Sequence, residues 1–182
     1  MARKKTFHIF REAKKRGAYD DMPMLPDDNQ VQLHLSRNDR PQPFFLICEK
    51  DTLLLLMSGG GAVEFKETSV ASFPLKPGDC VYVPAGAPHR IVPEGESVML
   101  RFKAREPGLE AMAWYCAPCG AELHRDLWDT AEHASQDRFA AAAGRFSADE
   151  RLRRCAACGA VHPPLDLAAF RWTEAAVEAR AV

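Results

Sequence analysis

The sequence of 182 residues carries almost no net charge, because 24 lysines and arginines are balanced by 25 aspartates and glutamates. This balance argues against the strongly basic surfaces that bind nucleic acid or anionic membranes. No apolar stretch reaches the roughly 18 residues that a membrane span requires, and the opening Met1-Ala-Arg-Lys-Lys lacks the apolar core of a secretory signal peptide. We therefore expect a cytoplasmic protein whose partner is a small molecule or another protein, and neither nucleic acid nor a membrane.

Four of the six cysteines form two Cys-x-x-Cys-Gly sequences. Without an export signal disulfide bonds are not expected, and reduced thiolates that hold a metal ion explain the spacing better. A Cys-x-x-Cys turn directs both sulfurs at one centre, and the glycine after it permits a positive φ. A redox dithiol or unrelated cysteines would suit one such pair, whereas two matched pairs favour a tetrahedral thiolate site for zinc or iron. The predicted metal ligands are Cys116, Cys119, Cys155 and Cys158.

A metal with four protein ligands has no coordination position left for a substrate, so we expect this site to stabilise the fold and not to catalyse. His162 follows the second cysteine pair and is interpreted as structural, with spare ligand as the alternative. Cys80 is interpreted as a core residue. The histidines His8, His124 and His133 are interpreted as surface residues.

Short apolar segments separated by glycine and proline turns follow one another through the first hundred residues. They predict strands at 31–35, 44–48, 53–57, 62–65, 70–75, 80–83 and 98–102. The turns recur about every ten residues, which is typical of antiparallel sandwiches and barrels. A basic segment at 4–16 is compatible with a helix, and from Arg105 onward the composition favours helical stretches.

These changes of composition divide the chain into regions, with a boundary near Pro107-Gly108. We expect an N-terminal helix and lead-in at 1–28, a barrel at 29–106, the region of the four cysteines at 107–165 and a tail at 166–182.

The segment from Gly78 to His89 reads Gly-Asp-Cys-Val-Tyr-Val-Pro-Ala-Gly-Ala-Pro-His. It matches the second motif of cupins, G-x5-P-x-G-x2-H, at every fixed position. With the cysteine pairs after it, the chain resembles the bacterial 3-hydroxyanthranilate 3,4-dioxygenases, small cupins that carry a rubredoxin-like site of four cysteines. The resemblance implies an all-β fold, a cupin double-stranded β-helix (jelly-roll) barrel with an N-terminal helix and a C-terminal four-cysteine metal knuckle plus helices. It also implies a homodimer, because cupin barrels commonly pair.

The resemblance further implies where a catalytic iron would be held, and here the sequence departs from the family. Those enzymes bind Fe(II) through a His and a Glu of the first motif and a His of the second. In this chain the three positions are Leu46, Thr52 and His89, and a catalytic Glu of the family falls on Arg101. We predict His89 and Arg101 as the catalytic residues. The predicted ligand pocket consists of Leu46, Cys48, Thr52, Leu54 and Arg40. In this pocket Cys48 is a weak candidate for a thiolate ligand, and Arg40 is offset by about two residues from a family arginine.

The sequence leaves several functions open. A divergent enzyme could use His89 as the fifth ligand of a haem, since haem supplies four nitrogens of its own. A retained ring-opening dioxygenase could take its ligands from a shifted strand register, with His34, Glu49 and Asp51 as replacements. A non-catalytic binding module or pseudoenzyme is the third possibility. We favour a divergent member that acts on or binds a small aromatic or amino-acid-derived molecule and whose usual non-haem iron site is eroded.

Overall fold

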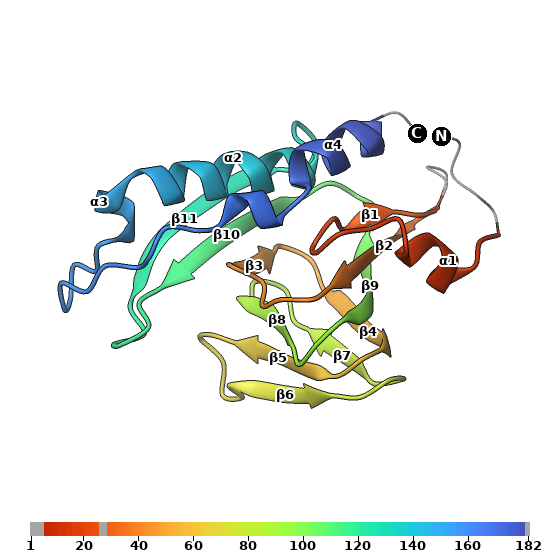
Figure 1. The fold of residues 1–182 in the computed structure, drawn as a ribbon, viewed down its shortest axis with the longest axis horizontal. Helices are drawn as coiled ribbons and strands as arrows, with labels where there is room; N and C mark the ends of the chain where they lie inside the picture. Colours follow the sequence, from red (N-terminus) through yellow and green to blue (C-terminus); the bar gives the residue numbers. More distant parts are fainter. Residues whose placement is uncertain (1–5, 26–28, 181–182) are drawn as a thin grey trace.

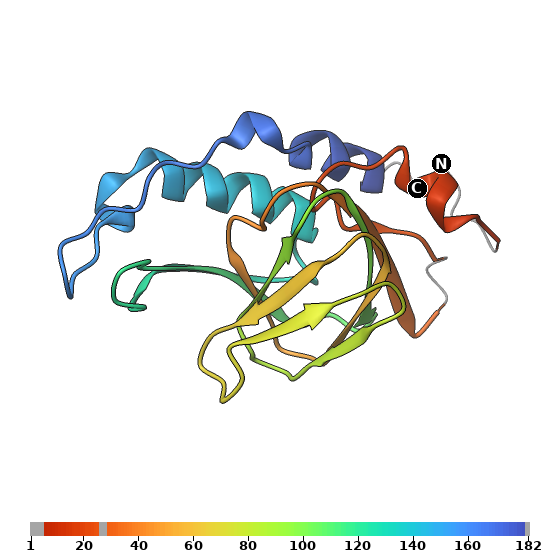
Figure 2. The ribbon, with the colours of Figure 1, turned by 60° about the horizontal axis from the view of Figure 1, so that its bottom comes forward.

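The protein is described from a computed structural model, and the structure describes residues 6–25 and 29–180. Two antiparallel sheets face each other and form a barrel (Figure 1; Figure 2). One sheet has the order β1 (Met22–Pro23), β2 (Val31–Asn38), β9 (Ser97–Ala104), β4 (Thr52–Ser58) and β7 (Cys80–Val83). The other has the order β11 (Glu122–Asp129), β10 (Leu109–Tyr115), β3 (Phe45–Cys48), β8 (His89–Pro93), β5 (Gly61–Phe65) and β6 (Ser72–Leu75). The predicted all-β jelly-roll barrel is confirmed.

The helices lie outside this barrel. They are α1 (Ile9–Ala13), α2 (Ser135–Ala148), α3 (Glu150–Arg153), a 3-10 turn at Leu167–Ala169 and α4 (Trp172–Arg180). Helix α2 packs over the hairpin of β10 and β11 and against α4 (Figure 1). The indole nitrogen of Trp172 donates to the carbonyl oxygen of Tyr19 at 3.1 Å, which docks the C-terminal helix on the N-terminal lead-in. Among the described residues, no helix has the length and apolar character to span a membrane.

Alternation along β9 separates two cores. Met99 belongs to the main core between the sheets, whereas Leu100 belongs to a second core on the outer face of the first sheet. Ala13 and Ala175 from the terminal helices complete that outer core. Because side chains alternate between the faces of a strand, Arg101 faces the barrel interior together with Met99.

Each predicted strand has a counterpart in the barrel, with ends that differ by a few residues. The helix expected at 4–16 is shorter and covers Ile9–Ala13, while residues 4 and 5 lie outside the described residues.

The expectation of helices from Arg105 onward is wrong for β10 and β11. The segment Leu109–Tyr115 is rich in helix formers, yet its two faces are both buried: Met112 contributes to the main core, and Ala111 packs in a small cluster with Ile47. Pairing with β3 and β11 on either side overrides the local preference. One sheet therefore runs across the expected boundary between residues 106 and 107, while the division of the chain into regions stays a prediction.

Candidate functional site

The four predicted metal ligands come from two turns of the same local shape. The first turn joins β10 to β11, and the second follows α3. The amide of Gly120 donates to the carbonyl of Cys116 at 2.8 Å, and the amide of Gly159 donates to the carbonyl of Cys155 at 2.9 Å. The two glycines have φ values of 75° and 76°, which residues with a Cβ rarely adopt. We call this pair of turns the knuckle.

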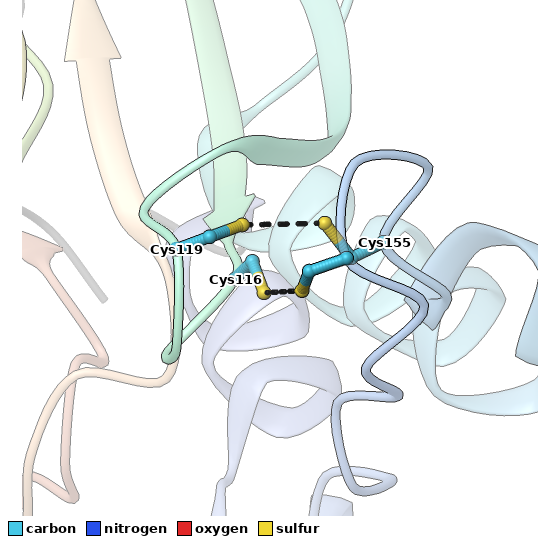
Figure 3. Close-up of side chains that lie close together, drawn as sticks. Cys116, Cys119 and Cys155 are labelled. Carbon is cyan, nitrogen blue, oxygen red and sulfur yellow. Dashed lines mark hydrogen bonds between the residues drawn. The ribbon is translucent and has the colours of Figure 1, made fainter.

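The knuckle brings four sulfurs around one point. Cys116 and Cys158 lie 3.5 Å apart, as do Cys119 and Cys155, and all four sulfurs lie within 4.8 Å of one another. Figure 3 shows the thiols of the first turn and of Cys155 directed toward one another. Metal–sulfur bonds of about 2.3 Å imply tetrahedral edges of ~3.8 Å, so the arrangement fits a metal ion. Within the described ranges, this is the one group of three or more potential ligands that converge. A bound metal would tie the hairpin to the C-terminal segment and would have no position open for a substrate.

An aromatic stack begins two residues before the first ligand of the knuckle, at Trp114. The ring centroids of Trp114 and Phe146 are stacked 4.2 Å apart, and the ring of His124 lies nearly parallel to both, at 6.0 Å from Trp114 and 6.4 Å from Phe146. The prediction that His124 lies on the surface is therefore wrong: the ring is half-buried, and burial followed by the charge of Arg145 lowers its pKa. The ring of His162 contacts Phe146, and its Nδ1 lies 2.7 Å from the carbonyl of Pro163, so it supports the stack and is not a spare ligand.

The structure agrees with the interpretation of two histidines as surface residues and corrects the interpretation of one cysteine as a core residue. His8 and His133 are exposed, as predicted. Cys80 is exposed on the outer face of the first sheet, opposite Leu55, so its assignment to the core is wrong. The alternation of a four-residue strand does not reveal which face is the inner one.

His89 opens strand β8 and points into the barrel, where none of its surface is exposed. Its Nδ1 lies 3.1 Å from the carbonyl oxygen of Ala87, and its Nε2 lies 2.7 Å from Nη1 of Arg101. A guanidinium is always a donor, so Nε2 accepts and Nδ1 carries the ring proton. Burial, followed by the charge of Arg101, lowers the pKa of His89 well below its ordinary value, which agrees with this neutral tautomer.

Arg101 crosses the barrel interior from β9 in the opposite sheet. Its Nε lies 3.3 Å from a carboxylate oxygen of Asp21, and both side chains are almost completely buried. Asp21 adopts a φ of 40°, in the left-handed region that residues other than glycine seldom occupy. The carboxylate of Asp21 compensates the buried charge of Arg101, and the guanidinium of Arg101 also reaches His89.

The other predicted pocket residues divide into two groups. Leu46 pairs with His89 and Leu54 pairs with Arg101 across neighbouring strands, and Cys48 and Thr52 are buried nearby in β3 and β4. Arg40 lies apart at the surface, where its guanidinium pairs with Asp39 at 2.7 Å. The structure therefore brings together every predicted pocket residue except Arg40, and the catalytic role of the group stays a prediction.

The sequence of this chain is similar to those of several known proteins. No protein-family model matches the chain. The 3-hydroxyanthranilate 3,4-dioxygenase of Brucella anthropi is 31% identical over 132 residues, which cover 69% of this chain and 66% of that protein. The protein of the same name from Jannaschia sp. is 32% identical over 130 residues, with the same shares covered. The chain thus spans just under two thirds of the length of these relatives.

This protein is a 3-hydroxyanthranilate 3,4-dioxygenase-like cupin. Solved structures that resemble it include a hydroquinone 1,2-dioxygenase in complex with Cd²⁺ and 4-hydroxybenzonitrile, at 20% identity and a TM-score of 0.47, covering 53% of this chain and 71% of that one. A cupin-2 domain protein of Shewanella frigidimarina has a TM-score of 0.48 at 14% identity, with 55% and 95% covered.

In this dioxygenase-like cupin, the barrel residues do not fit the iron site that the resemblance implies. Leu46 offers no donor atom, and the lone pair on Nε2 of His89 accepts from a guanidinium instead of facing a metal. Burial raises the pKa of the Cys48 thiol, which disfavours the thiolate that a metal requires.

Of the replacement ligands suggested by a shifted register, His34 pairs with Arg101 and lies on the same face of the sheet, whereas the two carboxylates face elsewhere. Glu49 is exposed and accepts from the amide of Leu109 at 2.7 Å. Asp51 is exposed and accepts from the hydroxyl of Tyr82 and the amide of Ala85. Neither carboxylate enters the barrel. A haem on His89 does not fit either, because the ring is fully enclosed.

Sequence analysis missed a second charged pair in the barrel of this cupin. Nζ of Lys103 lies 2.5 Å from Oε1 of Glu110, and Oε2 of the same carboxylate accepts from the hydroxyl of Ser135 at 2.8 Å. Lys103 is two residues beyond Arg101 and therefore faces the same interior, so strand alternation offered a signal for it. No local signal placed Asp21 beside Arg101, because that contact joins segments that are distant in the sequence. Glu110 is only seven residues from Lys103, and the two meet because the chain reverses between β9 and β10.

Proposed function

We propose that this chain is a divergent member of the dioxygenase-like cupins that binds a small aromatic or amino-acid-derived molecule without a catalytic iron in its barrel. The observation that carries the proposal is the hydrogen bond from Arg101 to Nε2 of His89. Pairing of two chains into a homodimer stays a prediction.

The guanidinium opposes metal binding in two ways. It occupies the lone pair that the single remaining imidazole would give to the metal. Its fixed positive charge also lies where a divalent cation would have to sit, and like charges repel strongly in a buried site. Asp21 neutralises Arg101 and thereby holds the cation in place.

A ring-opening dioxygenase with altered ligands is the competing proposal, and the names of the similar proteins support it. It requires a metal in the barrel in addition to the one in the knuckle, so metal content discriminates between the two functions. A haem-dependent redox function would require a Soret band.

The first experiment is elemental analysis and an absorption spectrum of the purified protein, beside a Cys116→Ser/Cys155→Ser variant. We expect about one metal ion per chain, which this variant loses, no Soret band, and no ring opening of 3-hydroxyanthranilate. A second metal ion or a haem band that disappears in His89→Ala would refute a barrel free of catalytic metal.

A further inference from the structure

A small pocket lies where the ion pair of Lys103 and Glu110 meets the thiol of Cys48, between β3, β4, β9 and β10. The space that a water-sized molecule can reach in it is ≈ 30 Å³. Since about 10–15 Å³ of such space holds one water molecule, the pocket takes about two water-sized groups in contact. It therefore suits a molecule of two heavy atoms and excludes an aromatic ring.

The hydroxyl of Thr52 indicates a polar occupant for this pocket. The residue is 1% exposed and lines the pocket, and its Oγ1 atom has no hydrogen-bond partner among the described residues. A buried polar group without a partner costs about 1–3 kcal/mol, so a small molecule that hydrogen-bonds to this oxygen would be stabilised there. One side chain of the pocket thus has hydrogen-bonding capacity left for a ligand.

Three groups that can transfer protons or electrons share the pocket. The thiol of Cys48 donates to Oε1 of Glu110 at 3.9 Å, and Nζ of Lys103 donates to the same oxygen at 2.5 Å. Burial raises the pKa of the Cys48 thiol, so the sulfur rests protonated and needs a base before it acts as a nucleophile. Burial alone would lower the pKa of Lys103, but Glu110 raises it above its ordinary value, so the amine carries a proton that it can give.

The exposed side of the pocket is acidic. Its lining includes the exposed residues Glu49, Asp51 and Glu106, and the one cation among them, Lys50, pairs with Glu106 at 2.7 Å. The excess of negative charge opposes the entry of anions, whereas a neutral molecule is not repelled. Size and charge together therefore favour a small neutral molecule.

We infer that this pocket admits hydrogen peroxide, which oxidises Cys48 to a sulfenic acid. The sulfur attacks one peroxide oxygen, an S–O bond forms and the O–O bond breaks, while the thiol proton passes to Glu110. The leaving hydroxide takes a proton from Lys103, which recovers one from Glu110. One thiol and one hydrogen peroxide thus give one sulfenic acid and one water, and the sulfur loses the two electrons that the peroxide gains.

Exposure alone predicts a different order of reactivity. Cys80 is exposed on the outer face of the first sheet, whereas Cys48 is 6% exposed. Because accessible thiols are ordinarily oxidised first, faster oxidation of Cys48 would have to come from the groups of the pocket. Cys80 is therefore an internal reference within the same chain.

The test treats the full chain, with its knuckle metal bound, with hydrogen peroxide and stops the reaction with catalase. The protein is then unfolded in dimedone, which labels sulfenic acids, and peptide mass spectrometry follows the label at Cys48 and at Cys80. The matched oxidant is tert-butyl hydroperoxide, which has the same O–O bond but is too large for the pocket.

Two variants test the pocket itself. Thr52→Val keeps the shape of the side chain and removes the unpartnered hydroxyl, so it breaks no hydrogen bond. Glu110→Gln removes the base but leaves Lys103 without its anion. Lys76→Met changes an exposed lysine in a distant turn and is the control. Circular dichroism verifies that each variant is folded.

We expect hydrogen peroxide to label Cys48 at least about tenfold faster than Cys80 and tert-butyl hydroperoxide to label Cys80 first. Both pocket variants should slow the labelling of Cys48 at least about tenfold, as loss of a positioned proton acceptor or hydrogen-bonding group does, while Cys80 reacts as before. Lys76→Met should react like the parent.

Three results would overturn the assignment and leave the pocket as a site for water only. They are labelling of Cys48 no faster than Cys80, the same order with both oxidants, and the parent rate in Thr52→Val. The inference goes beyond the proposed function and is independent of it, because metal content decides that function whatever the peroxide does.

Discussion

Arg101 and His89 join the two sheets of the barrel through a hydrogen bond of 2.7 Å between Nη1 and Nε2. The bond connects β9 to β8 in the part of the barrel where the family resemblance places a metal. A fixed side-chain cation with its own carboxylate partner, Asp21, thus links the sheets there. The stability of the barrel should depend on each member of this group.

Substitution of Arg101 by methionine should lower the free energy of unfolding by about 3–5 kcal/mol, because Asp21 would remain buried without its cation. Urea denaturation measures the change. The matched control is Arg180→Met, since that side chain is 58% exposed and its guanidinium lies 2.5 Å from Asp137, and loss of such a surface pair costs about 0–1 kcal/mol. Equal effects of the two substitutions would contradict a structural role for the buried pair.

The buried imidazole of His89 should make stability depend on pH. Its pKa in the folded state lies well below the ordinary value, so the unfolded chain takes up a proton near pH 6.5 while the folded chain does not. Stability is therefore complete above about pH 6.5 and falls by up to about 1.4 kcal/mol per unit as the pH drops below it.

Unfolding at pH 7.5 and pH 5.5 tests this dependence in the parent and in His89→Gln, whose amide oxygen can accept from Arg101 but does not titrate. The variant should lose less stability than the parent between the two values. His133→Leu removes an exposed ring and should retain the parent's loss. An identical loss in His89→Gln and in the parent would show that His89 does not carry the effect.

The features that the sequence predicted are those with a local chemical signature. Two Cys-x-x-Cys-Gly turns predicted the knuckle because spacing and glycine conformation act within a few residues. Apolar segments between glycine and proline turns predicted the barrel strands, and the motif that ends at His89 placed that side chain inside the barrel.

The features that it did not predict depend on contacts between distant segments. The family resemblance placed Arg101 at a catalytic position, but only the folded chain shows that Asp21 neutralises it. Strand β10 contains helix formers and becomes a strand because β3 and β11 flank it. The outward face of Cys80 follows from the position of β7 in the sheet, which its four residues do not encode.

Restoring the ligands that the family resemblance implies should create a metal site only when the guanidinium is removed. We expect Leu46→His/Thr52→Glu/Arg101→Gln to bind an additional Fe²⁺ or Co²⁺ per chain, since it supplies two histidines and a carboxylate. Leu46→His/Thr52→Glu with Arg101 intact should show the metal content of the parent. Elemental analysis after desalting measures both, and equal uptake by the two variants would show that Arg101 is not the obstacle.

The knuckle metal should hold the C-terminal segment more than the barrel. The first turn belongs to the β10–β11 hairpin and the second follows α3, and Trp114, two residues before Cys116, stacks on Phe146 of α2. Structural zinc sites contribute about 10–16 kcal/mol of binding free energy to the segments they order.

In Cys116→Ser/Cys155→Ser, amide hydrogen exchange at residues 150–162 should accelerate by at least about a hundredfold, while β2 and β9, which pair along their whole length, should keep their protection. Cys80→Ser removes an exposed thiol outside the knuckle and should exchange like the parent. Uniform acceleration throughout the chain would instead mean that the metal stabilises the barrel and the C-terminal segment as one cooperative unit.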